Sequence, residues 1–190
     1  DRPDPAGGTL RAAADALHRL PPESMGAEAT TLALKNLVVD ADDPLGGLDT
    51  GATALATGTM AVLRETENVE VAESAAVLLA AVAAKRPDAL LSQLQTAVDT
   101  VAETRRRFPG EEVTYQAVVM LVQLIGQDPV EAGTHFGTVL NWLSEFDFDD
   151  ETARGSIERT LRLSASIVRE HPGMLRPHVR EIVGLADETG

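Results

Sequence analysis

The chain has 190 residues, enough for one ordinary globular domain, and its 30 acidic residues against 16 basic ones give a formal net charge of −14. This charge disfavours binding to nucleic acids and to anionic membrane surfaces, because both depend on clustered lysine and arginine. The sequence has no apolar run long enough to cross a bilayer, and the absence of cysteine excludes disulfides and cysteine metal sites.

The same features indicate a compartment. Residues 1–8 lack the basic and apolar regions of a signal peptide, and a chain without cysteine suits a reducing interior. We therefore expect a cytoplasmic protein without membrane insertion. Since the sequence starts at Asp1 rather than at methionine, we expect it to be part of a larger chain or complex. The acidity indicates either a charged surface that keeps the protein soluble, as in adaptation to high salt, or a basic partner.

The first predicted element is a leading amphipathic helix over residues 9–20. Pro21 and Pro22 end it, and its apolar residues share one helix face: Leu10, Ala13, Ala14 and Leu17. It resembles the second helix of a pair whose first helix is missing.

From residue 25 onward the sequence repeats. The chain can be aligned on four prolines that stand 43, 42 and 43 residues apart: Pro44, Pro87, Pro129 and Pro172. Proline suits the first turn of a helix and disfavours helix in the residue before it. Each unit is therefore predicted to contain a helix A that ends before the proline and a helix B that begins after it. Apolar residues at common offsets after the prolines mark one face of helix B.

Four units are predicted, at about 25–64, 70–107, 112–146 and 153–188. We expect A helices over 26–39, 70–85, 112–126 and 153–170, and B helices over 45–60, 88–107, 129–145 and 173–187. Polar turns at 65–70, 108–110 and 147–151 separate the units. A period of roughly 40 to 47 residues with helical patterning is typical of stacked helix pairs.

Two units depart from the pattern. Gly47, Gly51 and Gly58 lie in the first B helix where later units carry larger apolar groups, which indicates either a poorly packed end unit or a thin helix at a contact site. Gln123 and Gly126 lie near the end of the third A helix. We therefore do not predict regular curvature of the repeat array at this unit.

These units resemble HEAT and armadillo-like helical repeats, in the short acidic form found in extreme halophiles. The clearest matches are ESAAVLLAAVAAKRPDALLSQLQTAVDTVAE at 73–103 and RTLRLSASIVREHPGMLRPHVREIVGLADE at 159–188. The resemblance covers about four units. It implies an all-α fold over residues 1–190, namely a right-handed α-solenoid of antiparallel helix pairs after a leading helix. It also implies that the B helices line a concave surface that holds a protein partner.

Some proteins that resemble this family are enzymes, such as di-iron hydroxylases with paired histidine and glutamate ligands. None of the four histidines here is followed by glutamate: His18, His135, His171 and His178. The sequence also lacks an HExxH motif, a nucleophile elbow and a phosphate-binding loop. We therefore expect no catalytic residue, cofactor or metal. The alternatives are a metal-dependent hydroxylase or lyase on the same scaffold and a nucleic-acid-binding repeat protein.

Residues 147–151 carry carboxylates with the spacing of a calcium-binding loop. Thr152 stands at the sixth position, however, where the sharp turn of such a loop needs glycine. Acidic residues just before a helix are explained by N-capping and by the helix dipole. We predict a helix start here, with a weak cation site as the alternative.

Two other features have alternative interpretations. The basic triplet Arg105, Arg106 and Arg107 closes a B helix, where cations complement the helix dipole, or it contacts an acidic partner. Trp142 lies beside the apolar face, where it is either partly buried or a binding anchor.

We predict a non-enzymatic protein–protein interaction scaffold that binds its partner through the B helices. The candidate contacts flank the apolar face on successive B helices: Gln95, Asp99, Thr138, Asn141, Trp142, His178 and Glu181.

Overall fold

The computed structural model describes residues 5–40 and 51–189, and every regular element in these ranges is a helix. The all-α prediction is therefore confirmed. The helices are α1 (Pro5–Arg19), α2 (Met25–Asp40), α3 (Ala52–Glu65), α4 (Val69–Lys85), α5 (Pro87–Leu91), α6 (Leu94–Arg107), α7 (Glu112–Gln127), α8 (Pro129–Ala132), α9 (Phe136–Leu143), α10 (Glu151–Glu170), α11 (Pro172–Leu175) and α12 (Val179–Thr189).

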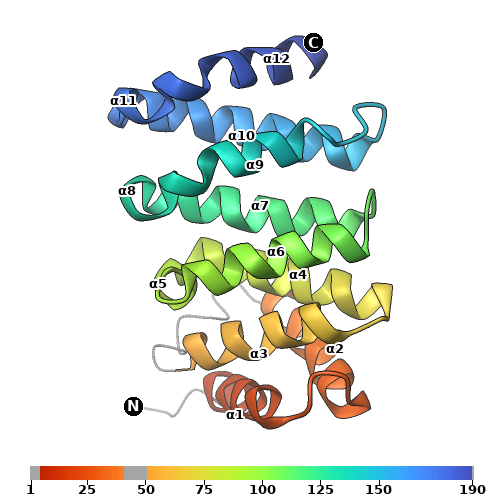
Figure 1. The fold of residues 1–190 in the computed structure, drawn as a ribbon. Helices are drawn as coiled ribbons and strands as arrows, with labels where there is room; N and C mark the ends of the chain where they lie inside the picture. The colour runs from red at the N-terminus through yellow and green to blue at the C-terminus, as the bar shows by residue number, and fades with distance from the viewer. Residues whose placement is uncertain (1–4, 41–50, 190) are drawn as a thin grey trace.

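The helices pack in two layers that follow the chain order (Figure 1). In the back layer α2 contacts α4, α4 contacts α7, and α7 contacts α10. In the front layer α1 contacts α3, α3 contacts α6, and α9 contacts α12. The back layer holds the predicted A helices and the front layer the predicted B helices. The inner A helices α4 and α7 each contact two other helices of the back layer, and α7 is buried along most of its length.

The A helices begin and end close to the predicted residues because local signals set both ends. The Asn68 side chain accepts hydrogen bonds from the backbone N–H groups of Glu70 and Val71 and so caps the start of α4. The later A helices end two residues before their prolines. The intervening residues leave the helix with φ between −140° and −133°, as a following proline favours: Arg86, Asp128 and His171.

The predicted B helices of the last three units are helical along most of their length, but they are not single continuous α-helices. Pro87, Pro129 and Pro172 each start a short helix, as expected. The α-helix is then interrupted, by a turn at residues 92–93 and by short 3-10 helices at Gly133–His135 and Arg176–His178, before the longer helices α6, α9 and α12 begin. Each short helix buries one apolar side chain three residues after its proline, and the break lets the longer helix run back along the front layer. The residues buried in this way are Leu90, Ala132 and Leu175.

In the first unit, Pro44, Gly47 and the predicted start of the B helix at residue 45 lie outside the described residues. The described helix α3 ends five residues beyond the predicted residue 60, at Glu65. Its apolar face continues through Val62 and Leu63, both of which are buried. The turn that follows is correspondingly short.

Small residues allow close packing at the positions that depart from the repeat. A Cβ atom on Gly58 would lie 3.0 Å from the backbone nitrogen of His18, so this glycine lets α3 approach the backbone of α1. A Cβ atom on Gly126 would lie 3.0 Å from Cδ2 of Leu163 in α10. Both glycines therefore lie at helix contacts.

Gln123 connects three helices of the back layer. With its amide oriented to satisfy both neighbours, it donates to the Ala80 carbonyl at 2.7 Å and accepts from Nη2 of Arg159 at 2.5 Å. A buried amide that is paired on both sides fits the core without the cost of an unsatisfied polar group. This buried glutamine thus links α4, α7 and α10.

Large apolar side chains are exposed at both ends of the stack. Met25 and Leu37 are exposed on α2, and Val179 and Val183 on α12. The position aligned with Val183 in the preceding unit is Leu140, which is buried. Within the described residues, no helix has the length and apolar character needed to span a membrane.

Candidate interaction surface

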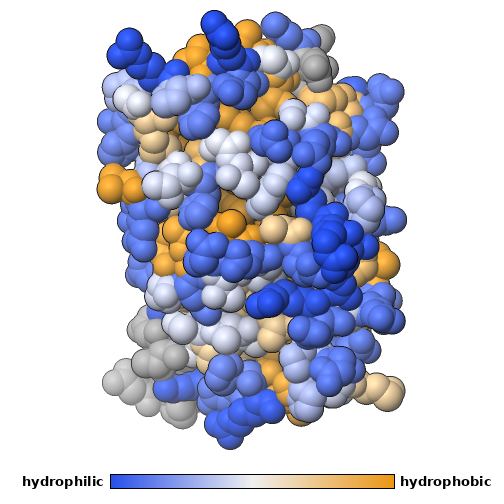
Figure 2. Space-filling model, viewed as in Figure 1, coloured by the Kyte–Doolittle hydropathy of each residue, from blue (hydrophilic) through white to orange (hydrophobic). Residues whose placement is uncertain are grey.

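The front layer carries the predicted contact residues on α6, α9 and α12. Gln95 and Asp99 are exposed one turn apart on α6, and Nε2 of Gln95 donates to Oδ1 of Asp99 at 2.9 Å. Thr138 is exposed on α9. Figure 2 shows that this face is mainly hydrophilic, with an apolar area at the level between α6 and α9.

A groove of about 390 Å³ lies between α9 and α12. It brings together three of the predicted residues, Asn141, His178 and Glu181, although His178 lies in the turn that precedes α12. The remaining lining residues are Gly137, Leu140, Ser144, Gly184 and Leu185. Small residues on both helices keep the groove open, and its polar groups lie above an apolar floor.

His178 is held in place by the preceding unit. Its ring meets the Phe136 ring edge-on, with the ring centroids 5.8 Å apart. A Cβ atom on Gly137 would lie only 2.7 Å from Cε1 of His178, so the glycine makes room for the imidazole. The side chain is half-buried and its position at the groove is fixed by packing.

Trp142 was predicted as a contact residue on the exposed surface of its B helix. The structure shows that its side chain is buried. It is 7% exposed and belongs to the hydrophobic core. The guanidinium of Arg105 lies over its ring, 5.4 Å from the centroid. Of the two interpretations of this tryptophan, the structure supports burial.

The basic triplet makes three different contacts. Arg105 forms an ion pair with Glu145 after α9, and Arg106 pairs with Glu103 on its own helix. Arg107 donates to backbone carbonyls at the C-terminal end of α3, including those of Leu63, Arg64 and Thr66. The dipole that Arg107 complements is therefore that of the preceding B helix as well as its own. Sequence reasoning missed these partners, although the repeat period places residues 64 and 107 side by side.

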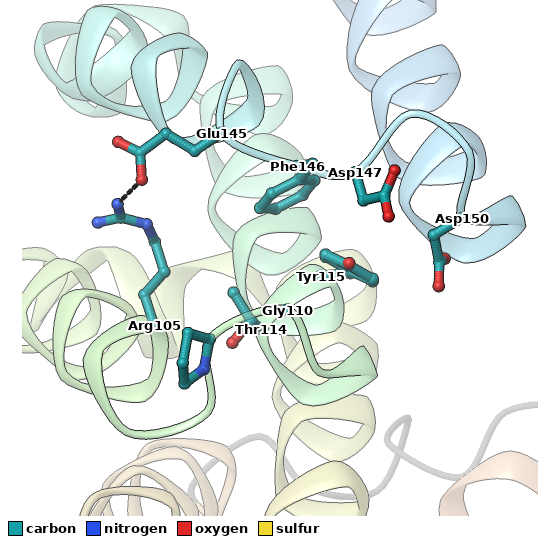
Figure 3. A pocket seen from close by; sticks show the side chains of 9 residues that line it. Arg105, Gly110, Thr114, Tyr115, Glu145, Phe146, Asp147 and Asp150 are labelled. Carbon is teal, nitrogen blue, oxygen red and sulfur yellow. Dashed lines mark hydrogen bonds and ion pairs between the residues drawn. The ribbon is translucent and has the colours of Figure 1, made fainter.

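A second cavity, of about 280 Å³, lies where α6 ends and α7 begins, under the loop at residues 144–150 (Figure 3). Its lining residues are Arg105, Pro109, Gly110, Thr114, Tyr115, Glu145, Phe146, Asp147 and Asp150. Tyr115 is only 2% exposed, and its ring packs against Phe146 with the centroids 4.5 Å apart and the planes 56° apart. Sequence reasoning did not single out this tyrosine.

The acidic loop beside this cavity starts α10, as predicted. Oδ1 of Asp147 accepts from the Asp149 backbone N–H at 3.0 Å, and Oδ1 of Asp150 accepts from that of Ala153 at 2.9 Å. These bonds form the turn and the N-cap of the helix. In the described part of the chain, no group of three or more His, Cys, Asp or Glu side chains could hold a metal ion.

The carboxylates give the cavity a negative potential. The pKa of Tyr115 is raised above its usual value, first by burial and then by the negative charges of Asp150, Asp147 and Glu111. A second acidic group lies on the back layer, where burial and then the charges of Glu112, Glu111 and Glu70 raise the pKa of Glu73.

Comparisons of the chain with family models, with curated proteins and with solved structures find no match.

Proposed function

We propose that the chain is a right-handed α-solenoid of HEAT-like repeats that acts as a non-enzymatic scaffold for protein–protein interaction. Its partner binds along the front layer, where the B helices lie. The observation that carries the proposal is the groove between α9 and α12, where Asn141, His178 and Glu181 converge from two successive units. Stacked repeats commonly present such extended binding surfaces.

The groove has the composition of a protein-binding surface. Leu140 and Leu185 provide a buried apolar floor, while Asn141 and Glu181 are exposed and offer hydrogen-bonding and charged groups around it. Contact with the Phe136 ring already positions His178. Binding of a partner therefore costs little conformational entropy at this side chain. Gln95 and Asp99 extend the polar surface to the preceding unit.

The test begins with capture of the partner from native cell extract at matched salt, followed by its purification. We expect Asn141→Ala combined with Glu181→Ala to weaken binding of the purified partner about tenfold or more, with unchanged helical circular dichroism. Asn36→Ala is the matched control, because Asn36 is exposed on α2 in the back layer. If this control weakens binding as much as the groove variant, or if neither variant changes it, the proposal is wrong.

We further propose that the acidic surface is of the halophile type and that the protein acts in the cytoplasm. The net charge of −14 implies repulsion among carboxylates that added salt screens. The melting temperature is therefore expected to rise as potassium chloride is increased from about 0.1 M to 1 M and beyond. A melting temperature that stays constant or falls over this range would contradict the halophile interpretation.

A further inference from the structure

We propose that the cavity between α6, α7 and the loop at 144–150 receives a lysine or arginine side chain of the partner protein. This inference rests on the proposed interaction function and specifies the chemistry that the surface recognises. It is carried by an aromatic wall, the hydroxyl of a packed tyrosine that opens onto the cavity, and an excess of carboxylates around one small cavity.

The Tyr115 hydroxyl is the first element of the argument. The side chain is 2% exposed and lines the cavity, and Figure 3 shows it between the Phe146 ring and the Asp150 side chain. No hydrogen bond joins this hydroxyl to another group among the described residues. The side chain is packed while its hydroxyl oxygen stays open to the cavity, so this oxygen is available to accept a hydrogen bond from a ligand there.

The charges around the cavity select the ligand. Arg105 is the single cation among the lining residues and is already paired with Glu145. The charges of Asp147 and Asp150 have no such cation beside them in the lining. Each of these carboxylates uses Oδ1 for a backbone N–H, which leaves Oδ2 available to accept from a ligand. Burial first, and then the charges of Asp150 and Asp147, raise the pKa of Tyr115.

The size and the walls of the cavity favour an organic cation over a metal ion. Its volume of about 280 Å³ far exceeds the ~30 Å³ of a water molecule. The Tyr115 and Phe146 rings offer apolar and π surface that suits an alkyl stem or a guanidinium plane. Within the described residues, no three or more His, Cys, Asp or Glu side chains are placed so that they could hold a metal ion. A basic side chain therefore suits both the carboxylates and the aromatic wall of this cavity.

The probes are acetyl-Gly-Arg-Gly-amide and its citrulline counterpart, which has nearly the same shape without the charge. Titration of ¹⁵N-labelled protein with the arginine peptide is expected to give saturable NMR shifts at Tyr115 and Phe146, and the citrulline peptide is expected to give none. Asp150→Asn should weaken binding of the arginine peptide about tenfold, because it removes a charge-assisted hydrogen bond while asparagine retains the N-cap. Tyr115→Phe should weaken it as well.

Asp149→Asn is the matched control, because Asp149 lies on the same loop, is exposed and does not line the cavity. The proposal is overturned if both peptides bind equally, if Asp149→Asn weakens binding as much as Asp150→Asn, or if calcium ions alone produce the same saturable shifts. If Asp150→Asn leaves binding of the purified partner unchanged while the groove variant weakens it, only the cavity assignment fails. If neither variant matters, the interaction function fails too.

Discussion

Arg107 offers the sharpest test of how adjacent units are held together. Its guanidinium donates to the carbonyls of Leu63, Arg64 and Thr66, which would otherwise lack partners at the end of α3. Arg107→Met keeps the aliphatic stem but removes these donors and the favourable charge at the helix terminus. A charged hydrogen bond contributes ~1.5–3 kcal/mol and the dipole ~0.3–1 kcal/mol, but the site is only half-buried. We therefore expect a loss of about 2 kcal/mol.

For a chain of this length, that loss corresponds to a fall of about 4–8 °C in the melting temperature, measured by circular dichroism at 222 nm. Arg106→Met is the control, because Arg106 lies on the same turn but is exposed and, in the described part of the chain, pairs with Glu103 of its own helix. We expect no resolvable change from the control. Equal shifts for the two variants would show that Arg107 does not act through the carbonyls of α3.

Two further predictions concern single polar groups. Thr59 is fully buried, and its hydroxyl has no hydrogen-bond partner among the described residues, so Thr59→Val should stabilise the protein by about 1 kcal/mol in chemical denaturation. Thr104→Val, where the buried hydroxyl bonds to the Thr100 carbonyl, should not stabilise it. The raised pKa of Glu73 means that the folded state binds a proton more tightly than the unfolded state. Glu73→Gln should therefore raise the melting temperature at pH 7, and a gain that persists undiminished at pH 4 would contradict this.

The positions of the A helices could be predicted because short-range chemistry sets their ends. Pro87 disfavours helical conformation in Arg86, and Asn68 caps α4 through its own side chain. Both effects act within three residues of the helix end, so they can be read from the local sequence. The same holds for Asp150, which caps α10 as the acidic loop predicted.

The breaks in the B helices could not be predicted in this way. Apolar residues on both sides of each break continue the 3.6-residue pattern, so periodicity alone favours one helix. In the third unit the break begins at Gly133, where a Cβ atom would lie 2.5 Å from the sulfur of Met174. That constraint comes from α11 in the next unit. Tertiary packing thus requires a glycine at the position where this interruption begins, and that requirement is not visible in the local sequence.

The cavity was missed for a related reason. Tyr115 and Phe146 lie at opposite ends of the third unit, and each looks like an ordinary core residue when the sequence is read alone. The repeat period still contained a usable signal. Arg105 and Glu145 are 40 residues apart and form an ion pair, and Thr66 and Glu28 are 38 residues apart and form a hydrogen bond. In a stack of units, residues about one period apart are spatial neighbours.

Glu145 joins the two candidate surfaces into one. Its Oε2 pairs with Arg105 at the cavity, while its Oε1 accepts from Nδ2 of Asn141 at the groove, at 3.4 Å. A partner that places a basic side chain in the cavity adds a positive charge near this carboxylate, and a contact at Asn141 competes for its other oxygen. The groove and the cavity therefore share an electrostatic group, which is the arrangement expected if the proposed partner spans α6, α9 and α12.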